Sequence, residues 1–189
     1  GGKVYSLLGN HEIMNVMNKM DYVAPSGFKE FETLCKGKFG GFCKSKDGRE
    51  MRKKAFERGN LFATKFACER YSILKIGSNL FCHGDIVTEL AKSYSIKEVN
   101  LLIRDWLLGK TIKKDFEKFI TDVNKSHLWS RKYSVLPPDL KNSTACNGVD
   151  EVLNTYKVGK IIVGHTPQST GINSTCDNKL WRADIGFNR

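Results

Sequence analysis

The chain has 189 residues, 40% of them hydrophobic and 27% charged, which is the composition of an ordinary globular domain. No apolar run approaches the length of a membrane-spanning helix, so we expect no membrane partner. The formal net charge of +11 favours anionic partners. Few aromatic residues lie among the basic ones, so a surface that stacks nucleic-acid bases is not favoured.

The first part of the chain predicts a strand, a short helix and a basic insertion. Residues 3–8 are apolar enough for a buried strand, and residues 12–19 predict a helix. The insertion is expected at about residues 25–58, with a loop-rich beginning and short helical pieces. Residues 50–66 can form a helix that is interrupted at Gly59 and Asn60.

The middle of the chain predicts a β-hairpin followed by two amphipathic helices. Residues 71–76 and 79–82 are β-like runs on either side of Gly77 and Ser78. Ser95 and Glu98 form a capping box, and apolar residues follow it at helical spacing. A second helical stripe is formed by Phe116, Phe119, Ile120 and Val123.

The last part of the chain predicts a polar loop, one helix and two strands. The loop runs from Pro137 to Gly148, and residues 149–156 predict the helix. Residues 160–163 and 180–185 predict the strands. Strands and helices alternate in part, which favours an α/β sandwich over an all-α fold.

The six cysteines match no zinc-binding spacing and no C-x-x-C motif. Cys68 and Cys82 lie in apolar runs and are predicted to be buried thiols. This pattern favours a reducing, intracellular location, most simply the cytoplasm. Asn142 and Asn173 each begin a glycosylation sequon, which matters only in a secreted protein.

Three of the four histidines share one local context. His11, His83 and His165 each follow a hydrophobic β-run and have a glycine close by. Ligands bind at strand ends in α/β sheets, and histidines gathered there suit a metal ion. A single strand-end histidine is more often structural, but three in the same setting favour a site. His127 lacks this context and is interpreted as a structural or surface residue.

The motifs around these histidines resemble a known family. The segments Gly9-Asn10-His11-Glu12, His83-Gly84 and Gly164-His165-Thr166 resemble the third, fourth and fifth motifs of the calcineurin-like metallophosphoesterases. The similarity extends over nearly the whole chain to the bacterial-type, Shewanella-like branch of the phosphoprotein phosphatases. It implies a β-sandwich flanked by helices, with residues 1–189 as one partial phosphoesterase domain.

The resemblance implies a role for each matching residue at the metal. Asn10 would bind one metal ion through its amide oxygen, and His83 and His165 would bind the same ion through ring nitrogens. His11 would protonate the leaving alkoxide as the general acid, and Glu12 would orient the turn from behind the ligands.

Two further residues follow from the same resemblance. Arg131 would hold phosphate oxygens in a bidentate fork, although a surface arginine packed on Trp129 is an equally good interpretation. Asp85 stands where the family has a second glycine, and it would alter the surroundings of the ligands.

The family's first two motifs, Asp-x-His and Gly-Asp-x-x-Asp-Arg-Gly, do not occur in this sequence. Both ends of the chain resemble cuts inside a domain, so we expect an N-terminal βαβ part to be missing. The family uses two metal ions, which can be Mn, Fe or Zn, and a metal-bound hydroxide attacks the phosphorus. With one ion's ligands largely present and no bridging carboxylate, these residues alone are expected to be nearly inactive.

Three functions remain open at this stage. The first is a metal-dependent phosphatase acting on phosphoserine, phosphothreonine or phosphotyrosine in proteins, or on a small phosphoester. The second is a nucleotide phosphoesterase of the diadenosine tetraphosphate type. The third is a non-catalytic module, either a degenerate phosphatase or a basic binder of nucleic acid.

Overall fold

The computed structural model of the chain describes residues 1–34 and 47–186. These residues form two compact units. Unit 1 contains residues 1–10, 70–103 and 112–186, and unit 2 contains residues 11–34, 47–69 and 104–111.

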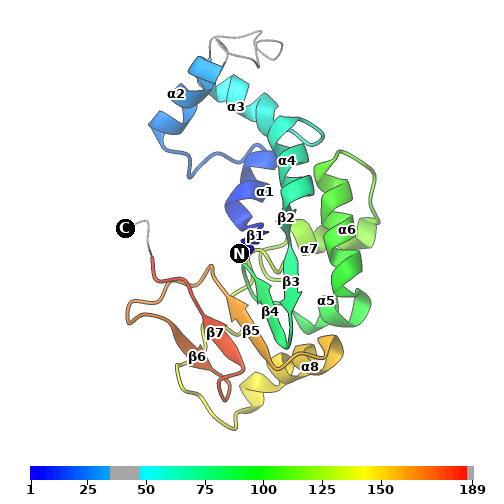
Figure 1. The fold of residues 1–189 in the computed structure, drawn as a ribbon, viewed down its shortest axis with the longest axis vertical. Coiled ribbons are helices and arrows are strands. Elements are labelled where there is room, and N and C mark those ends of the chain that lie inside the picture. Colours follow the sequence, from blue (N-terminus) through cyan, green and yellow to red (C-terminus); the bar gives the residue numbers. More distant parts are fainter. Residues whose placement is uncertain (35–46, 187–189) are drawn as a thin grey trace. The chain divides into compact units, whose positions relative to one another are not determined.

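Unit 1 is built on a mixed five-stranded sheet in the order β3-β4-β5-β7-β6 (Figure 1). In chain order its strands are β3 (Ile73–Ile76), β4 (Asn79–Cys82), β5 (Lys160–Val163), β6 (Asn173–Thr175) and β7 (Leu180–Arg182). The pairs β4–β5 and β5–β7 are parallel, whereas the hairpin β3–β4 and the edge pair β6–β7 are antiparallel. Two parallel strand ends therefore lie next to each other, after β4 and after β5.

A separate two-stranded parallel sheet joins β1 (Ser6–Leu7) to β2 (Arg70–Tyr71). The helices of unit 1 are α5 (Thr88–Ser93), most of α6 (Ile96–Leu107), α7 (Lys114–Thr121) and α8 (Asn147–Tyr156), with a short 3-10 turn, η2 (Thr144–Cys146), before α8. The core gathers apolar side chains from these helices and the sheet, including Ile73, Leu80, Phe116, Val149 and Ile161.

Unit 2 is a helical cluster. It contains α1 (Asn10–Val16) from His11 onward, α2 (Pro25–Leu34), α3 (Gly48–Phe56), α4 (Leu61–Glu69) and the last turn of α6. Its core is aromatic: the Phe56 ring stacks on Phe62 at 4.8 Å and lies 5.9 Å from the Phe31 ring. The Arg52 guanidinium lies over Phe31 and Phe56 at 5.0 and 4.8 Å, so its charge contributes to this packing.

The α/β class is confirmed, and several elements agree closely with the sequence predictions. The helix interruption at Gly59 and Asn60 separates α3 from α4, and the strands β4 and β5 have the predicted bounds. The capping box before α6 is also present, because the Ser95 N–H donates to Glu98 Oε2 at 2.8 Å and the Glu98 N–H donates to Ser95 Oγ at 3.3 Å.

Other predictions were wrong in detail. The first strand covers only Ser6–Leu7, and the chain before it is exposed, with Val4 93% accessible. Val123 lies beyond the end of α7 and is 57% exposed, so it is not part of the helix's buried stripe. Cys68 is exposed rather than buried, whereas Cys82 is buried as predicted.

The expected single domain of residues 1–189, with its basic insertion at about 25–58, stays a prediction. Residues 25–34 and 47–58 contribute α2 and α3 to unit 2, and residues 35–46 lie outside the described residues. Across the two described ranges, no helix is both long and apolar enough to cross a membrane.

Candidate functional site

The ends of β4 and β5 carry His83 and His165. The two strands are parallel neighbours, and their last residues, Cys82 and Val163, are register partners. His83 follows β4 directly, and His165 follows β5 after Gly164. The sheet ladder therefore fixes both histidines at one edge of unit 1.

Asn10 completes a group of three polar side chains at this edge. His83 Nε2 lies 2.8 Å from Asn10 Oδ1 and 3.1 Å from His165 Nδ1. Asn10 and His165 are almost buried, at 8% and 9% accessibility, and His83 is half-buried. We refer to Asn10, His83 and His165 as the donor cluster.

The distances within the donor cluster fit a shared metal ion. Ligand bonds of about 2.0–2.1 Å place two donors about 2.9 Å apart at a right angle and about 3.3 Å apart at a tetrahedral angle. The observed separations of 2.8 and 3.1 Å are close to this range. An amide oxygen with two imidazole nitrogens suits a transition metal such as Mn, Fe or Zn. Within the described ranges, no site is formed by three or more His, Cys, Asp or Glu side chains.

The backbone at His165 has an unusual conformation. Its φ angle is 59°, in the left-handed region that residues with a side chain rarely adopt. The preceding Gly164 donates its N–H to the His83 carbonyl at 2.9 Å, which links the two strand ends. The turn after β5 thus positions the His165 ring at a cost in backbone strain.

Gly84 lets a second loop approach the β4 end. A Cβ at this position would lie 2.9 Å from the Ser130 carbonyl oxygen and 3.1 Å from that of His127, so no side chain fits. The Gly84 N–H donates to the His127 carbonyl at 2.7 Å. The His-Gly motif therefore docks residues 127–130 onto the strand end.

Asp85 holds the next part of the same loop. Its carboxylate is fully buried, and Oδ2 accepts the backbone N–H groups of Tyr133 and Ser134 at 2.6 and 2.7 Å. Burial raises the pKa of Asp85, although these hydrogen bonds and the charge of Arg182 oppose the shift. Asp85 thus supports the segment that contains Arg131, without contacting the donor cluster through any of these hydrogen bonds.

Arg131 is anchored next to the donor cluster. Its Nε donates to the His165 carbonyl at 3.0 Å, and the residue is exposed. Nothing else in the described part of the chain hydrogen-bonds this guanidinium, so its terminal nitrogens are available to an anion. The phosphate-binding role of Arg131 stays a prediction.

His127 is a buried structural residue. Its Nε2 is hydrogen-bonded to Ser72 Oγ, and its side chain is inaccessible to solvent. Burial, with a smaller contribution from His83, lowers the pKa of His127 to about 3. The imidazole is therefore neutral at physiological pH.

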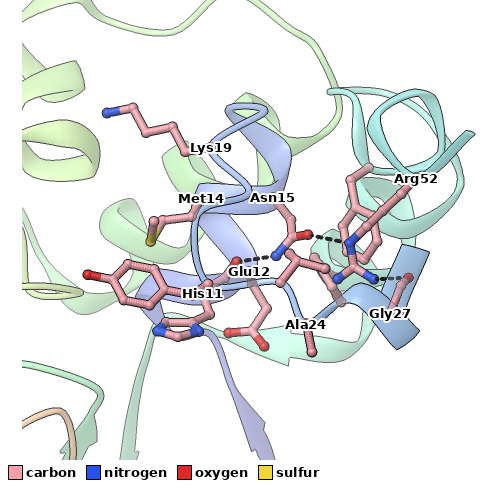
Figure 2. A pocket seen from close by; sticks show the side chains of 12 residues that line it. His11, Glu12, Met14, Asn15, Lys19, Ala24, Gly27 and Arg52 are labelled. Atoms are coloured by element: carbon pink, nitrogen blue, oxygen red, sulfur yellow. Dashed lines mark hydrogen bonds between the residues drawn. The ribbon is translucent and has the colours of Figure 1, made fainter. Parts of the chain in front are cut away.

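His11 and Glu12 belong to unit 2, where they line a pocket of about 330 Å³ (Figure 2). The His11 ring is exposed and packs at a tilt against the Tyr22 ring, with the ring centroids 5.2 Å apart. Glu12 lies in the first turn of α1, where a carboxylate interacts favourably with the helix dipole.

A hydrogen-bond chain fixes the helix that carries His11 (Figure 2). Asn15 Nδ2 donates to the His11 carbonyl at 2.8 Å, and Asn15 Oδ1 accepts Arg52 Nε at 2.8 Å. Arg52 Nη1 donates in turn to the Gly27 carbonyl at 3.1 Å. The sequence interpretation missed Asn15 and Arg52. Asn15 lies one helical turn after His11, and this spacing was the available signal.

No family model matches the chain. Among curated proteins, an uncharacterized protein of Acanthamoeba polyphaga mimivirus is 37% identical over 211 aligned positions, which cover 99% of this chain and 82% of that protein. The Shewanella-like protein phosphatase 2 of Arabidopsis thaliana is 28% identical, and the alignment covers 100% of this chain and 54% of the plant protein. The Shewanella-like protein phosphatase 1 of Plasmodium berghei is 26% identical, with 98% of this chain and 48% of that protein covered.

Solved structures show the same fold. A cold-active protein tyrosine phosphatase solved at 1.1 Å resolution matches 98% of this chain and 49% of its own, with a TM-score of 0.65 and 22% identity. The cold-active enzyme of a psychrophilic Shewanella species matches with the same TM-score and 21% identity. The chain spans about half the length of these phosphatases.

The likeness to these solved structures shows that the chain has their α/β fold. The chain belongs to the same family as the mimivirus protein, and it is similar over its whole length to the two Shewanella-like protein phosphatases.

Proposed function

We propose that this chain forms part of a metal-dependent phosphatase that hydrolyses phosphate monoesters, with phosphoproteins as the principal substrates. The observation that carries the proposal is the donor cluster, in which Asn10, His83 and His165 meet within 2.8 and 3.1 Å. The names of the relatives support the reaction class, and the substrate class follows from those names.

In this proposal the donor cluster holds one metal ion. Bound metal ions would neutralise charge on the phosphoryl group and activate a water molecule as the nucleophile. The sequence contains no Asp-x-His or Gly-Asp-x-x-Asp-Arg-Gly motif, so these 189 residues supply no matching bridging carboxylate. We expect them to bind metal weakly and to turn over substrate slowly without such a carboxylate.

The remaining roles are assigned to side chains of this chain. Arg131 binds phosphate oxygens with its terminal nitrogens while its Nε remains on the His165 carbonyl. His11 follows Asn10 in the chain and donates a proton to the leaving oxygen. The assignment of His11 rests on its place in the motif and on its exposed ring.

The proposal is tested by metal content and by phosphate release in the same set of variants. The protein is expressed from its full coding sequence, loaded with Mn²⁺, and analysed for bound metal by elemental mass spectrometry. His83→Asn and His165→Asn are expected to lower metal affinity by at least about 10–100-fold. Losing a residue that only hydrogen-bonds a metal ligand already has an effect of that size. His11→Asn is expected to retain the metal and lose about 10²–10⁴-fold in turnover.

A matched control tests the phosphate-binding role. Arg131→Ala is expected to raise KM for phosphopeptides and to leave metal content unchanged, whereas Lys132→Ala, which changes the neighbouring exposed cation, should alter neither. Metal content unaffected by both histidine variants would refute the metal site. Faster turnover of diadenosine tetraphosphate than of phosphopeptides would favour a nucleotide phosphoesterase. Metal binding without any turnover would indicate a degenerate phosphatase.

A further inference from the structure

A disulfide joins two segments of unit 1 that are distant in sequence. Cys146 ends η2, Cys176 follows β6, and the bond links them across 30 positions. Both residues are buried, with accessibilities of 3% and 0%. Structural disulfides persist in oxidising compartments and are rare in the cytosol. The bond is therefore an unexpected feature for a cytoplasmic protein.

A glycosylation sequon lies immediately before this disulfide. Asn142, Ser143 and Thr144 form the sequon, and both Asn142 and Thr144 are exposed. Asn142 has a φ of 48°, and its backbone N–H donates to Asp177 Oδ2 at 3.2 Å. Its side-chain amide forms no hydrogen bond within the described residues. A carbohydrate on Nδ2 would therefore break no side-chain hydrogen bond among the described residues.

The second sequon, which begins at Asn173, makes contacts in the folded chain that a glycan would break. Asn173 Nδ2 donates to Gln168 Oε1 at 2.9 Å and to the Gly171 carbonyl at 3.1 Å, and Oδ1 is buried. The sequon's last residue, Thr175, is fully buried and donates to the Pro137 carbonyl at 2.8 Å. A third sequon begins at Asn124, and its last residue, Ser126, is fully buried. Asn142 and Asn173 thus provide an internal comparison between an exposed acceptor and a hydrogen-bonded one.

We propose that the chain folds in an oxidising secretory compartment, where Cys146 and Cys176 are joined and Asn142 carries an N-linked glycan. The two thiols pass two electrons and two protons to the disulfide of an oxidoreductase. At Asn142, the Nδ2–carbon bond forms as Nδ2 loses a proton. The carbon–oxygen bond to the pyrophosphate of a lipid-linked oligosaccharide donor breaks at the same time.

The proposal does not depend on phosphatase activity, and it replaces the cytoplasmic location expected from the cysteine spacing. It rests on the coincidence of a buried disulfide with an open sequon on the same loop region.

The test uses the full coding sequence expressed without added targeting signals in a eukaryotic cell. Cells are lysed in an alkylating agent, and the protein is compared by mass with and without peptide N-glycosidase. We expect a glycan at Asn142, so that one glycan is lost in Asn142→Gln and in Thr144→Ala but none is lost in Asn173→Gln. Non-reducing digestion should release a peptide pair that joins Cys146 to Cys176.

Two results would overturn the proposal. One is an unmodified Asn142 in the wild-type protein. The other is alkylation of both Cys146 and Cys176 at lysis, which would show that they are reduced thiols in the cell. Neither readout measures phosphate release, so failure here is distinguishable from failure of the proposed phosphatase function.

Discussion

Asp85→Ala is expected to destabilise the protein substantially. The substitution leaves the buried N–H groups of Tyr133 and Ser134 without their acceptor at Asp85 Oδ2. Each unsatisfied buried donor costs about 1–3 kcal/mol, so the free energy of unfolding should fall by about 2–6 kcal/mol. For a chain of this size, Tm falls by about 2–4 °C per kcal/mol. Urea and thermal unfolding followed by circular dichroism measure both quantities.

Asp85→Asn should recover most of this loss, because an amide oxygen can accept the same two N–H groups. It should also change the pH dependence. Burial raises the folded-state pKa of Asp85 above its usual value, so the folded state binds the proton more tightly than the unfolded state. The carboxylate therefore lowers wild-type stability as pH rises from its unfolded pKa through the folded one. Asp85→Asn should gain stability relative to wild type over that window.

The matched control is Asp105→Ala, which removes an exposed ion pair with Lys110 at 2.8 Å. Exposed pairs contribute about 0.2–1 kcal/mol, so this variant should unfold close to wild type. If Asp85→Ala also unfolds within about 1 kcal/mol of wild type, Asp85 does not support the loop as described.

Three further variants test other parts of unit 1. Burial lowers the pKa of His127 to about 3, so between pH 6.5 and 3 the unfolded state binds more protons than the folded state. The free energy of unfolding should therefore fall as the pH drops through that range. His127→Gln should flatten this part of the stability curve, and an unchanged slope would contradict the argument from burial. Gly148→Ala places a Cβ 2.1 Å from the Tyr133 hydroxyl. The Tm of this variant should fall, although alanine has a higher helix propensity than glycine. A higher Tm would show that the Tyr133 ring moves aside freely. Cys146→Ser opens a loop of 30 residues and should cost about 3.6 kcal/mol by loop entropy under oxidising conditions. The difference from wild type should be smaller when the wild-type disulfide is reduced.

The elements predicted best from the sequence carry their own local signals. The strands β4 and β5 are short apolar runs bounded by glycine, and α6 begins with a reciprocal side-chain cap. The strand β6 was missed because Asn173–Thr175 is polar and becomes a strand only by pairing with β7. The six-residue helix α5 was missed because it is too short to show a period.

The grouping of His83 with His165 was inferred from a repeated context, because His11, His83 and His165 each follow a hydrophobic run and have a glycine close by, whereas Asn10 was added from the resemblance of the motifs. That reasoning could not assign His11 and His83 to different units, since the division depends on contacts among residues far apart in sequence. It also could not find the bond between Cys146 and Cys176, because a spacing of 30 residues identifies no partner. The hydrogen bonds by which Asp85 holds the Arg131 segment could not be predicted for the same reason, since its partners are backbone groups 48 and 49 positions away.

At position 165 the left-handed backbone favours one kind of residue for stability, whereas ion binding favours another. Glycine or asparagine adopts that conformation more readily than histidine does. A population of variants selected only for heat resistance should therefore drift away from histidine at this position. Selection for ion binding should retain the imidazole, so the residue recovered at position 165 reports which pressure acted.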